Sequence, residues 1–235
     1  MRPSCYVVSA LCAVALASPL AARETVHNLT GFSKIVASDH VKVEVFSGSD
    51  FSVVSDVSGT ARAQRLVVEQ DGDTLVISRK GRSSMILMGM ADYYTVTVHL
   101  PALTAITANR GVYVEASGTF PDMFQAKTSS GAEVDVDGLE AANVILAASS
   151  GSDLDVRGTC GSLLVEASSG SEIDAEDFEC KDVEAKASSG ADIEVYATGA
   201  LLARASSGGD IDVGGAPVDT KINESSGGDV SLPGS

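Results

Sequence analysis

Apolar and polar residues alternate with a period of two through the second half of the chain. The run Glu133-Val134-Asp135-Val136 is typical, and acid and apolar residues alternate in the same way near residues 153, 172, 192 and 210. A period of two is the pattern of a strand with one buried face. A second alternating run precedes each of these, with apolar residues seven and five positions before a glycine in nearly every copy. Each unit therefore contains two short strands.

A Ser-Ser-Gly triplet separates the two strands of each unit. The triplets end at Gly131, Gly151, Gly170, Gly190, Gly208 and Gly227, which are 18 to 20 residues apart. A unit this short cannot bury its apolar rows alone, so successive units must stack in register. Glycine permits the positive φ of a tight corner, and stacked serine hydroxyls can bond to the turn backbone and to one another.

We therefore predict an all-β fold, a right-handed single-stranded parallel β-helix with coils of about 19 residues over residues 109–232. Residues 24–108 are predicted to form irregular β coils and a cap of the same solenoid, making 24–235 one structural domain. Strands are expected near 41–45, 51–54 and 94–100, and at 66–69 and 75–77 as a hairpin across Asp71-Gly72. One column is expected to form an aliphatic spine: Val134, Leu154, Ile173, Ile193, Ile211 and Val230.

The first 23 residues have the order of a secretory signal. Arg2 is followed by an apolar stretch from Cys5 to Ala17 and then by small residues, with cleavage expected at about residues 17–23. An apolar stretch of this length is too short for a stable membrane span, and a lipoprotein signal ending at Cys12 is disfavoured because Ser9 stands three positions before it. We expect a bacterial protein exported to the periplasm or beyond, with no transmembrane span in the mature chain.

Several segments resemble a known family, the head GIN domain of putative autotransporter adhesins. They are Gly31-Phe32-Ser33-Lys34-Ile35, Asp73-Thr74-Leu75-Val76-Ile77, Val96-Thr97-Val98-His99-Leu100-Pro101-Ala102-Leu103, and the serine-rich glycine corners. The resemblance covers nearly the whole mature chain, although the family more often has Ser-Gly-Ser-Gly where this chain has Ser-Ser-Gly. It implies an exported β-helix and an adhesin-like role, and it brings no catalytic or binding residues with it.

The net charge of the chain disfavours one class of function. The chain carries 16 basic and 32 acidic residues, a formal charge of −16, with 44% hydrophobic residues, 5% aromatic residues and no Trp. Removing residues 1–23 takes away Arg2 and Arg23 and no acid, so the mature balance is 14 against 32, or −18. This charge repels the phosphate backbone and disfavours nucleic-acid binding.

The acidic residues of the repeat are expected to point outward in two columns on one face. Ladders of like charge attract cations, and Ca²⁺ prefers carboxylate oxygens, so weak Ca²⁺ binding is one interpretation. The alternative is a solvated face that resists aggregation, and no specific metal or cofactor site is predicted. The candidate residues are Glu133, Asp135, Asp153, Asp155, Glu172, Asp174, Asp192, Glu194, Asp210 and Asp212.

The other strand presents a mixed face with outward aliphatics at Ile145, Leu164 and Leu202. These residues are either a contact for a partner or ordinary scattered surface aliphatics. The segment Met85–Met90 is interpreted as a lid over one end of the solenoid.

The protein is predicted to be a non-catalytic envelope protein whose partner is an envelope protein or a glycan. A polysaccharide-active β-helical enzyme is the rival, but an active site interrupts a repeat and no catalytic residue stands out here. A cation-binding structural protein is the other alternative.

Two cysteines remain after the signal is removed, Cys160 and Cys180. Each lies ten residues before the corner glycine of its own coil, Gly170 and Gly190, so stacking places them on adjacent coils about 5 Å apart. This spacing and an oxidising compartment predict a disulfide, with two free thiols as the alternative.

Overall fold

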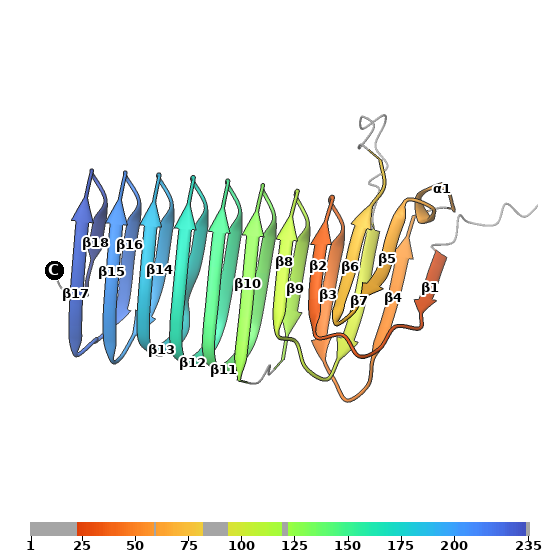
Figure 1. The fold of residues 1–235 in the computed structure, drawn as a ribbon, viewed down its shortest axis with the longest axis horizontal. Helices are drawn as coiled ribbons and strands as arrows, with labels where there is room; N and C mark the ends of the chain where they lie inside the picture. The colour runs from red at the N-terminus through yellow and green to blue at the C-terminus, as the bar shows by residue number, and fades with distance from the viewer. Residues whose placement is uncertain (1–22, 59, 82–93, 119–121, 234–235) are drawn as a thin grey trace, which may run out of the picture.

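The protein is a long β-solenoid, seen here in a computed structural model that describes residues 23–58, 60–81, 94–118 and 122–233 (Figure 1). Its coils stack along the long axis with their corners aligned on one side. The predicted all-β class and coils of roughly 20 residues are confirmed. Most of the expected signal and the whole of Met85–Met90 lie outside the described residues.

Each coil has two faces. Face A comprises the strands that lead into the corners, together with the antiparallel β5 at the N-terminal end. Its members are β5 (Leu66–Asp71), β6 (Thr74–Arg79), β2 (Lys34–Ser38), β8 (Ala105–Asn109), β10 (Met123–Ser129), residues 143–149, 162–168 and 182–188, β15 (Ala200–Ser206) and β17 (Asp219–Ser225).

Face B comprises the strands that leave the corners, together with β4 and β1 at the N-terminal end. Its members are β1 (Arg23–His27), β4 (Ser52–Val57), β7 (Tyr94–Leu100), β3 (Lys42–Ser47), β9 (Tyr113–Ser117), residues 133–136, 153–156 and 172–175, β14 (Asp192–Ala197), β16 (Asp210–Gly215) and β18 (Asp229–Ser231). Three strands run through the outer turn and so belong to both faces: β11 (Glu133–Ser149), β12 (Asp153–Ser168) and β13 (Glu172–Ser188). The described helix α1 (Thr60–Ala63) is a single turn.

The Ser-Ser-Gly corners are turns with two consecutive left-handed residues. Ser150 has φ 60° and Gly151 has φ 63°, and the other triplets repeat this pair. Positive φ at both central residues is a property of type I′ turns, and it favours glycine at this position. The Gly131 amide donates to the carbonyl of Ser150 in the next coil at 3.3 Å, and the Gly151 amide donates to Ser169 at 3.2 Å. The corners are thus part of the ladder between coils.

The hydroxyls that satisfy the corner backbone belong to the residue after the triplet rather than to the triplet itself. The buried Ser152 hydroxyl donates to the Ser149 carbonyl at 2.9 Å and accepts from the Ser149 amide at 3.1 Å. Ser171 makes the same pair of bonds with Ser168. The second serine of each triplet is instead exposed at the corner.

The predicted aliphatic spine is confirmed residue by residue. Val134 pairs with Leu154, Leu154 with Ile173, Ile173 with Ile193, Ile193 with Ile211, and Ile211 with Val230. The first five are at most 1% exposed. Each buried side chain stacks on its equivalent about 4.8 Å away, which is why small and aliphatic residues suffice for the core.

The N-terminal strands form coils out of chain order. The predicted hairpin is present as β5 paired antiparallel with β6. The coil made by β2 and β3 lies between the coil of β6 and β7 and the coil of β8 and β9, because β2 pairs with both β6 and β8 and β3 with both β7 and β9. The sequence alone did not reveal this insertion.

The two ends of the solenoid are closed differently. At the N-terminal end, β5 lies antiparallel on β6, and β4 and β1 extend face B beyond β7 with antiparallel pairing. At the C-terminal end, Thr220 and Glu224 replace the inward Leu201 and Ala205 of the preceding coil. Glu224 also accepts a hydrogen bond from the Val230 amide at 3.0 Å. This polar last coil limits the exposure of the core and blunts an open sheet edge.

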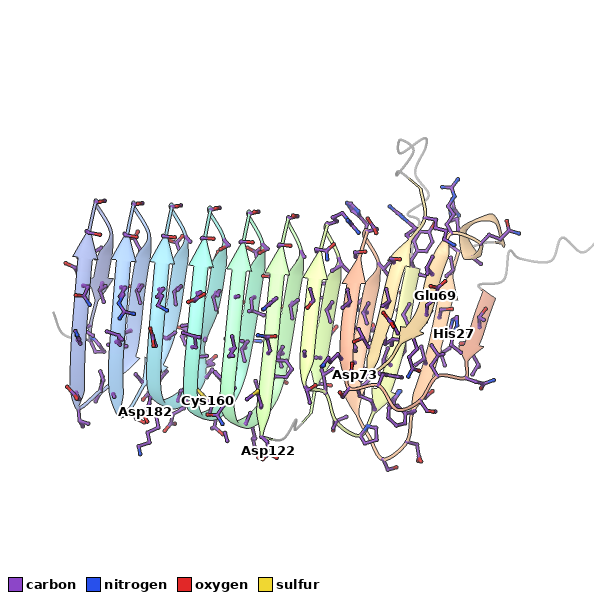
Figure 2. The ribbon with its side chains drawn as sticks, viewed as in Figure 1. His27, Glu69, Asp73, Asp122, Cys160 and Asp182 are labelled. Atoms are coloured by element: carbon purple, nitrogen blue, oxygen red, sulfur yellow. A yellow bond between two sulfur atoms is a disulfide. The ribbon has the colours of Figure 1, made fainter. Side chains whose placement is uncertain are left out.

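A disulfide joins Cys160 and Cys180, as predicted (Figure 2). The two residues are direct partners in the ladder between β12 and β13, with Cα atoms 4.5 Å apart. The bond clamps two adjacent coils at the outer turn, opposite the Ser-Ser-Gly corners.

Replacing Ile193 with Asp should destabilise the fold by several kcal/mol, because the new carboxylate would lie between Ile173 and Ile211 with no partner. Urea denaturation measures this loss. The matched control is Glu194→Ser on the outward side of the same strand, which should leave stability unchanged or slightly higher. An Ile193→Asp chain with an unchanged midpoint would contradict the spine.

Replacing both Cys160 and Cys180 with Ser should lower the free energy of unfolding by roughly 3 kcal/mol, the loop-closure contribution of a cross-link spanning about 20 residues. Denaturation with and without reductant tests this, since the double variant should no longer respond to reductant. Alkylation of both cysteines in exported, unreduced protein would count against the bond.

Candidate functional site

The ten predicted acidic residues lie on face B in two straight rows, as the repeat requires. The first row runs Glu133, Asp153, Glu172, Asp192, Asp210 and ends at Asp229. The second row runs Asp135, Asp155, Asp174, Glu194 and Asp212. First-row side chains are exposed, and those of the second row are partly or fully exposed. We call these two rows together the acidic face.

The second row is longer than the repeat suggested. Glu115 on β9 is in register with Asp135, and Glu44 on β3 is in register with Glu115. Both residues come from the irregular N-terminal half, where no Ser-Ser-Gly triplet marks the register. The alternation Val43-Glu44-Val45 indicated an outward Glu44, but only the insertion of the β2–β3 coil places it in this row.

Lys42 and Tyr113 bound the acidic face at its N-terminal side. Lys42 Nζ lies 2.8 Å from Glu44 and 3.4 Å from Glu115, and 5.5 Å from the centre of the Tyr113 ring. The Tyr113 hydroxyl donates to Asp135 at 2.5 Å. This hydrogen bond, together with burial and nearby carboxylates, raises the pKa of the Tyr113 hydroxyl. The phenol therefore stays protonated and serves as a hydrogen-bond donor to the acidic face.

Partial burial and crowding shift the pKa values of the acidic face. Partial burial, followed by the charges of neighbouring carboxylates, raises the pKa of Glu133, Asp155 and Glu194 above the ordinary value. Two like charges 4.8 Å apart repel by about 0.9 kcal/mol in a water dielectric before salt screening. The rows therefore favour protonation or the approach of cations.

The carboxylates come closest together where Asp174, Glu176 and Glu194 meet. One oxygen from each lies within 4.8 Å of the others. A shallow groove of about 470 Å³ adjoins this point and is lined by Glu176, Glu194, Tyr196 and Asp212 among others. Such oxygens are suited to hard cations. The attraction of Ca²⁺ to the acidic face nevertheless stays a prediction, because exposed carboxylates of this kind also occur without an ion.

Face A has a different surface. Ile145, Leu164 and Leu202 lie outward and half-buried on this face, as the sequence predicted. Beside them, Lys186 pairs with Glu166 at 3.0 Å and with Glu184 at 3.1 Å, and Arg204 pairs with Glu184 at 2.7 Å. Hydrogen bonds from Lys186 and Arg204 lower the pKa of Glu184. These four charges of face A are thus paired, whereas the carboxylates of the acidic face repel one another.

The histidines occupy structural positions. His27 shares a hydrogen bond of 2.9 Å with Ser55, and Ser55 is 3% exposed on the inward side of β4. Burial lowers the pKa of His27. His99 stacks on Phe46 with ring centres 5.2 Å apart, and His40 is a left-handed corner residue with φ 58°. The imidazole–hydroxyl pair joins β1 to β4 in the N-terminal cap.

The chain matches a known family. A family model for the head GIN domain of putative auto-transporter adhesins matches residues 31–217. The chain belongs to this family. Comparison with curated proteins found no match. Within the described residues, the structure contains no helix that is long and apolar enough to span a bilayer.

Solved structures share the fold. A putative adhesin of Bacteroides fragilis is 16% identical, with a TM-score of 0.81 over 90% of this chain and 97% of that one. A putative adhesin of Parabacteroides distasonis is 16% identical, with a TM-score of 0.69 over 91% and 98%. A protein of the same organism described as a putative lipid binding protein is 18% identical, with a TM-score of 0.66 over 90% and 95%. At these identities the likeness concerns the fold alone.

Stability should rise as the pH falls from 7 towards about 5. Carboxylates whose folded pKa is raised, such as Glu133, Asp155 and Glu194, bind protons more readily when folded. Their contribution to stability is therefore full below the unfolded pKa of about 4 and is lost as pH rises through the folded value. The folded pKa of Glu184 is lowered instead. Its contribution to stability is lost as the pH falls through that value, so stability should decrease again at lower pH. Urea denaturation at low salt, repeated from pH 7 down to below pH 4, measures both the rise and the later fall in stability.

Two controls tie the effect to the acidic face. Asp155→Asn with Glu194→Gln should reduce the gain between pH 7 and 5. At pH 7, added NaCl should raise the melting temperature, and millimolar Ca²⁺ should raise it more than NaCl of equal ionic strength. A melting temperature that is the same in low salt and in millimolar Ca²⁺ would contradict the repulsion.

Proposed function

We propose that this protein is an exported, non-catalytic, adhesin-like binding module of a bacterial cell envelope. The main observation behind this proposal is that outward carboxylates recur at equivalent positions of successive coils along the acidic face. A rigid surface of this kind suits an extended ligand, a glycan chain or a polypeptide segment, that lies along several coils.

Export is supported by two independent features. The residues before position 24 have the charged, apolar and small-residue order of a secretory signal. The disulfide between Cys160 and Cys180 suits an oxidising compartment outside the cytoplasm. We infer a location in the periplasm or on the cell surface.

The absence of catalysis is inferred from the repeat itself. Catalytic carboxylates act as a pair in different environments, one an acid and the other a base or nucleophile. Here the same outward acids recur in successive coils, and His27 bonds to an inward serine. A polysaccharide-active enzyme is the less supported alternative for this reason.

Charge restricts the ligand class. A face of carboxylates offers hydrogen-bond acceptors to sugar hydroxyls and attracts amines, but it repels uronates, sulfates and phosphates. We therefore expect the ligand to be a neutral or amino-sugar polymer or a basic peptide segment.

Glycan-array binding of the mature chain, residues 24–235, should detect neutral or amino-sugar polymers and no acidic ones. The triple variant Asp155→Asn, Asp174→Asn, Glu194→Gln should lose at least tenfold in affinity, while Glu166→Gln on face A should bind as the parent does. Reducing ends should not accumulate during prolonged incubation. Sustained release of reducing ends, or selective binding of acidic polymers, would refute the proposal.

A cation-binding structural role is a second candidate, favoured by the closeness of Asp174, Glu176 and Glu194. It would be supported by strong Ca²⁺-dependent stabilisation combined with no binding to any glycan or basic peptide.

A further inference from the structure

One window of face A differs in charge from the acidic face on the other side of the same coils. Between β10 and β17, a row of serines lies next to the corners, and three further rows of outward positions follow it. The corner-side row is Lys127, Ala147, Glu166, Lys186, Arg204 and Asn223; the middle row is Gln125, Ile145, Leu164, Glu184, Leu202 and Lys221; the outer-turn row is Met123, Asn143, Ser162, Asp182, Ala200 and Asp219. These rows hold four cations and four anions, so the window has no net charge.

The middle row is the apolar part of the window. A groove of about 600 Å³ runs past Ile145, Leu164 and Leu202. A second groove of about 440 Å³ continues from Ile145 towards Met123 and Ala105. Met123 is 58% exposed, an unusual position for a large apolar side chain. Together the grooves form one apolar strip that crosses several coils.

Charges on the two sides of this strip have opposite signs. The corner-side row holds Lys127, Lys186 and Arg204 against a single acid, Glu166. The outer-turn row holds Asp182 and Asp219 and no base. Because these rows are parallel to the solenoid axis, a rotation of 180° about that axis exchanges a basic row with an acidic one.

We propose that this window binds a second copy of the chain in a side-by-side, parallel dimer with its two-fold axis along the solenoid. In this arrangement Ile145, Leu164 and Leu202 each meet their own equivalents. Lys186 faces Asp182 of the second copy, and Arg204 lies near Asp219 of the second copy. Glu184 in the middle row would face Glu184 of the second copy. Its pairs with Lys186 and Arg204 within its own chain reduce the repulsion between these two carboxylates.

The acidic face cannot make the same contact. Two copies meeting there would oppose carboxylates in every coil, whereas the neutral window lets two strongly acidic chains approach without that repulsion. The dimer leaves the acidic faces of the two copies exposed on its two opposite outer sides, with their carboxylate rows running parallel. The inference is thus independent of the proposed ligand.

The expected contact area is small. Six strands spaced about 4.8 Å apart and about 20 Å of strand length give roughly 500 Å² per copy, or about 1,000 Å² in total. That is the lower end for a specific interface, so the dimer should dissociate on dilution, with a dissociation constant in the micromolar range.

Sedimentation velocity of the mature chain from 1 to 300 μM tests the dimer, and the parent should shift from monomer to dimer across this range. Leu164→Glu should remain monomeric throughout. The matched control is Val54→Glu, an aliphatic residue on the outward side of face B, which should dimerise as the parent does. Circular dichroism and melting temperature establish that each variant folds.

Charge exchange and cross-linking supply readouts that do not depend on Leu164→Glu. Asp219→Lys should weaken the dimer at least tenfold, and adding Arg204→Asp should restore it. A Leu164→Cys chain should be cross-linked to itself by a short bismaleimide, and a Val54→Cys chain should not. A parent that stays monomeric at 300 μM, a dimer insensitive to both Leu164→Glu and Asp219→Lys, or cross-linking at position 54 instead would each overturn the proposal.

Discussion

Hydrogen bonding between parallel coils, in strict register, is the constraint on which the rest of this structure depends. Once Val134 pairs with Leu154 and Leu154 with Ile173, the outward residues of the same strands are placed opposite their equivalents as well, and the register shifts only in the outer turn. Even the corners join this ladder through amides such as Gly131 and Gly151. A side-chain type that recurs at one position of the repeat therefore forms a row along the solenoid, with about 4.8 Å between neighbouring strands.

The same register has opposite consequences inside and outside the coil. Inward, it stacks aliphatic side chains into a narrow core without Trp. Outward, it aligns carboxylates that repel one another, and this repulsion adds to partial burial in raising the pKa of Asp155 and Glu194. The fold tolerates this repulsion because water and salt screen the outward rows while the inward rows exclude water. The disulfide between Cys160 and Cys180 adds a covalent clamp between two of the coils.

The two faces give the solenoid two different surfaces. The acidic face is uniform, highly charged and suited to an extended ligand, whereas face A combines paired charges with an apolar strip through Leu164. A polar last coil and antiparallel strands at the other end limit growth of the sheet by edge pairing. Association through face A would therefore join rods sideways and leave the ligand-facing surface free.

The sequence by itself determined the regular coils, the spine, the acidic rows from Glu133 onward and the disulfide, because a repeat with a fixed period leaves one register to choose. Only the tertiary structure placed the β2–β3 coil between later strands, extended the acidic row to Glu44 and Glu115, and put serine in the left-handed corner position. Pairing between residues far apart in sequence depends on which edges meet in space. Without a repeated marker such as Ser-Ser-Gly, local alternation tells which side a residue faces but not which strand lies beside it.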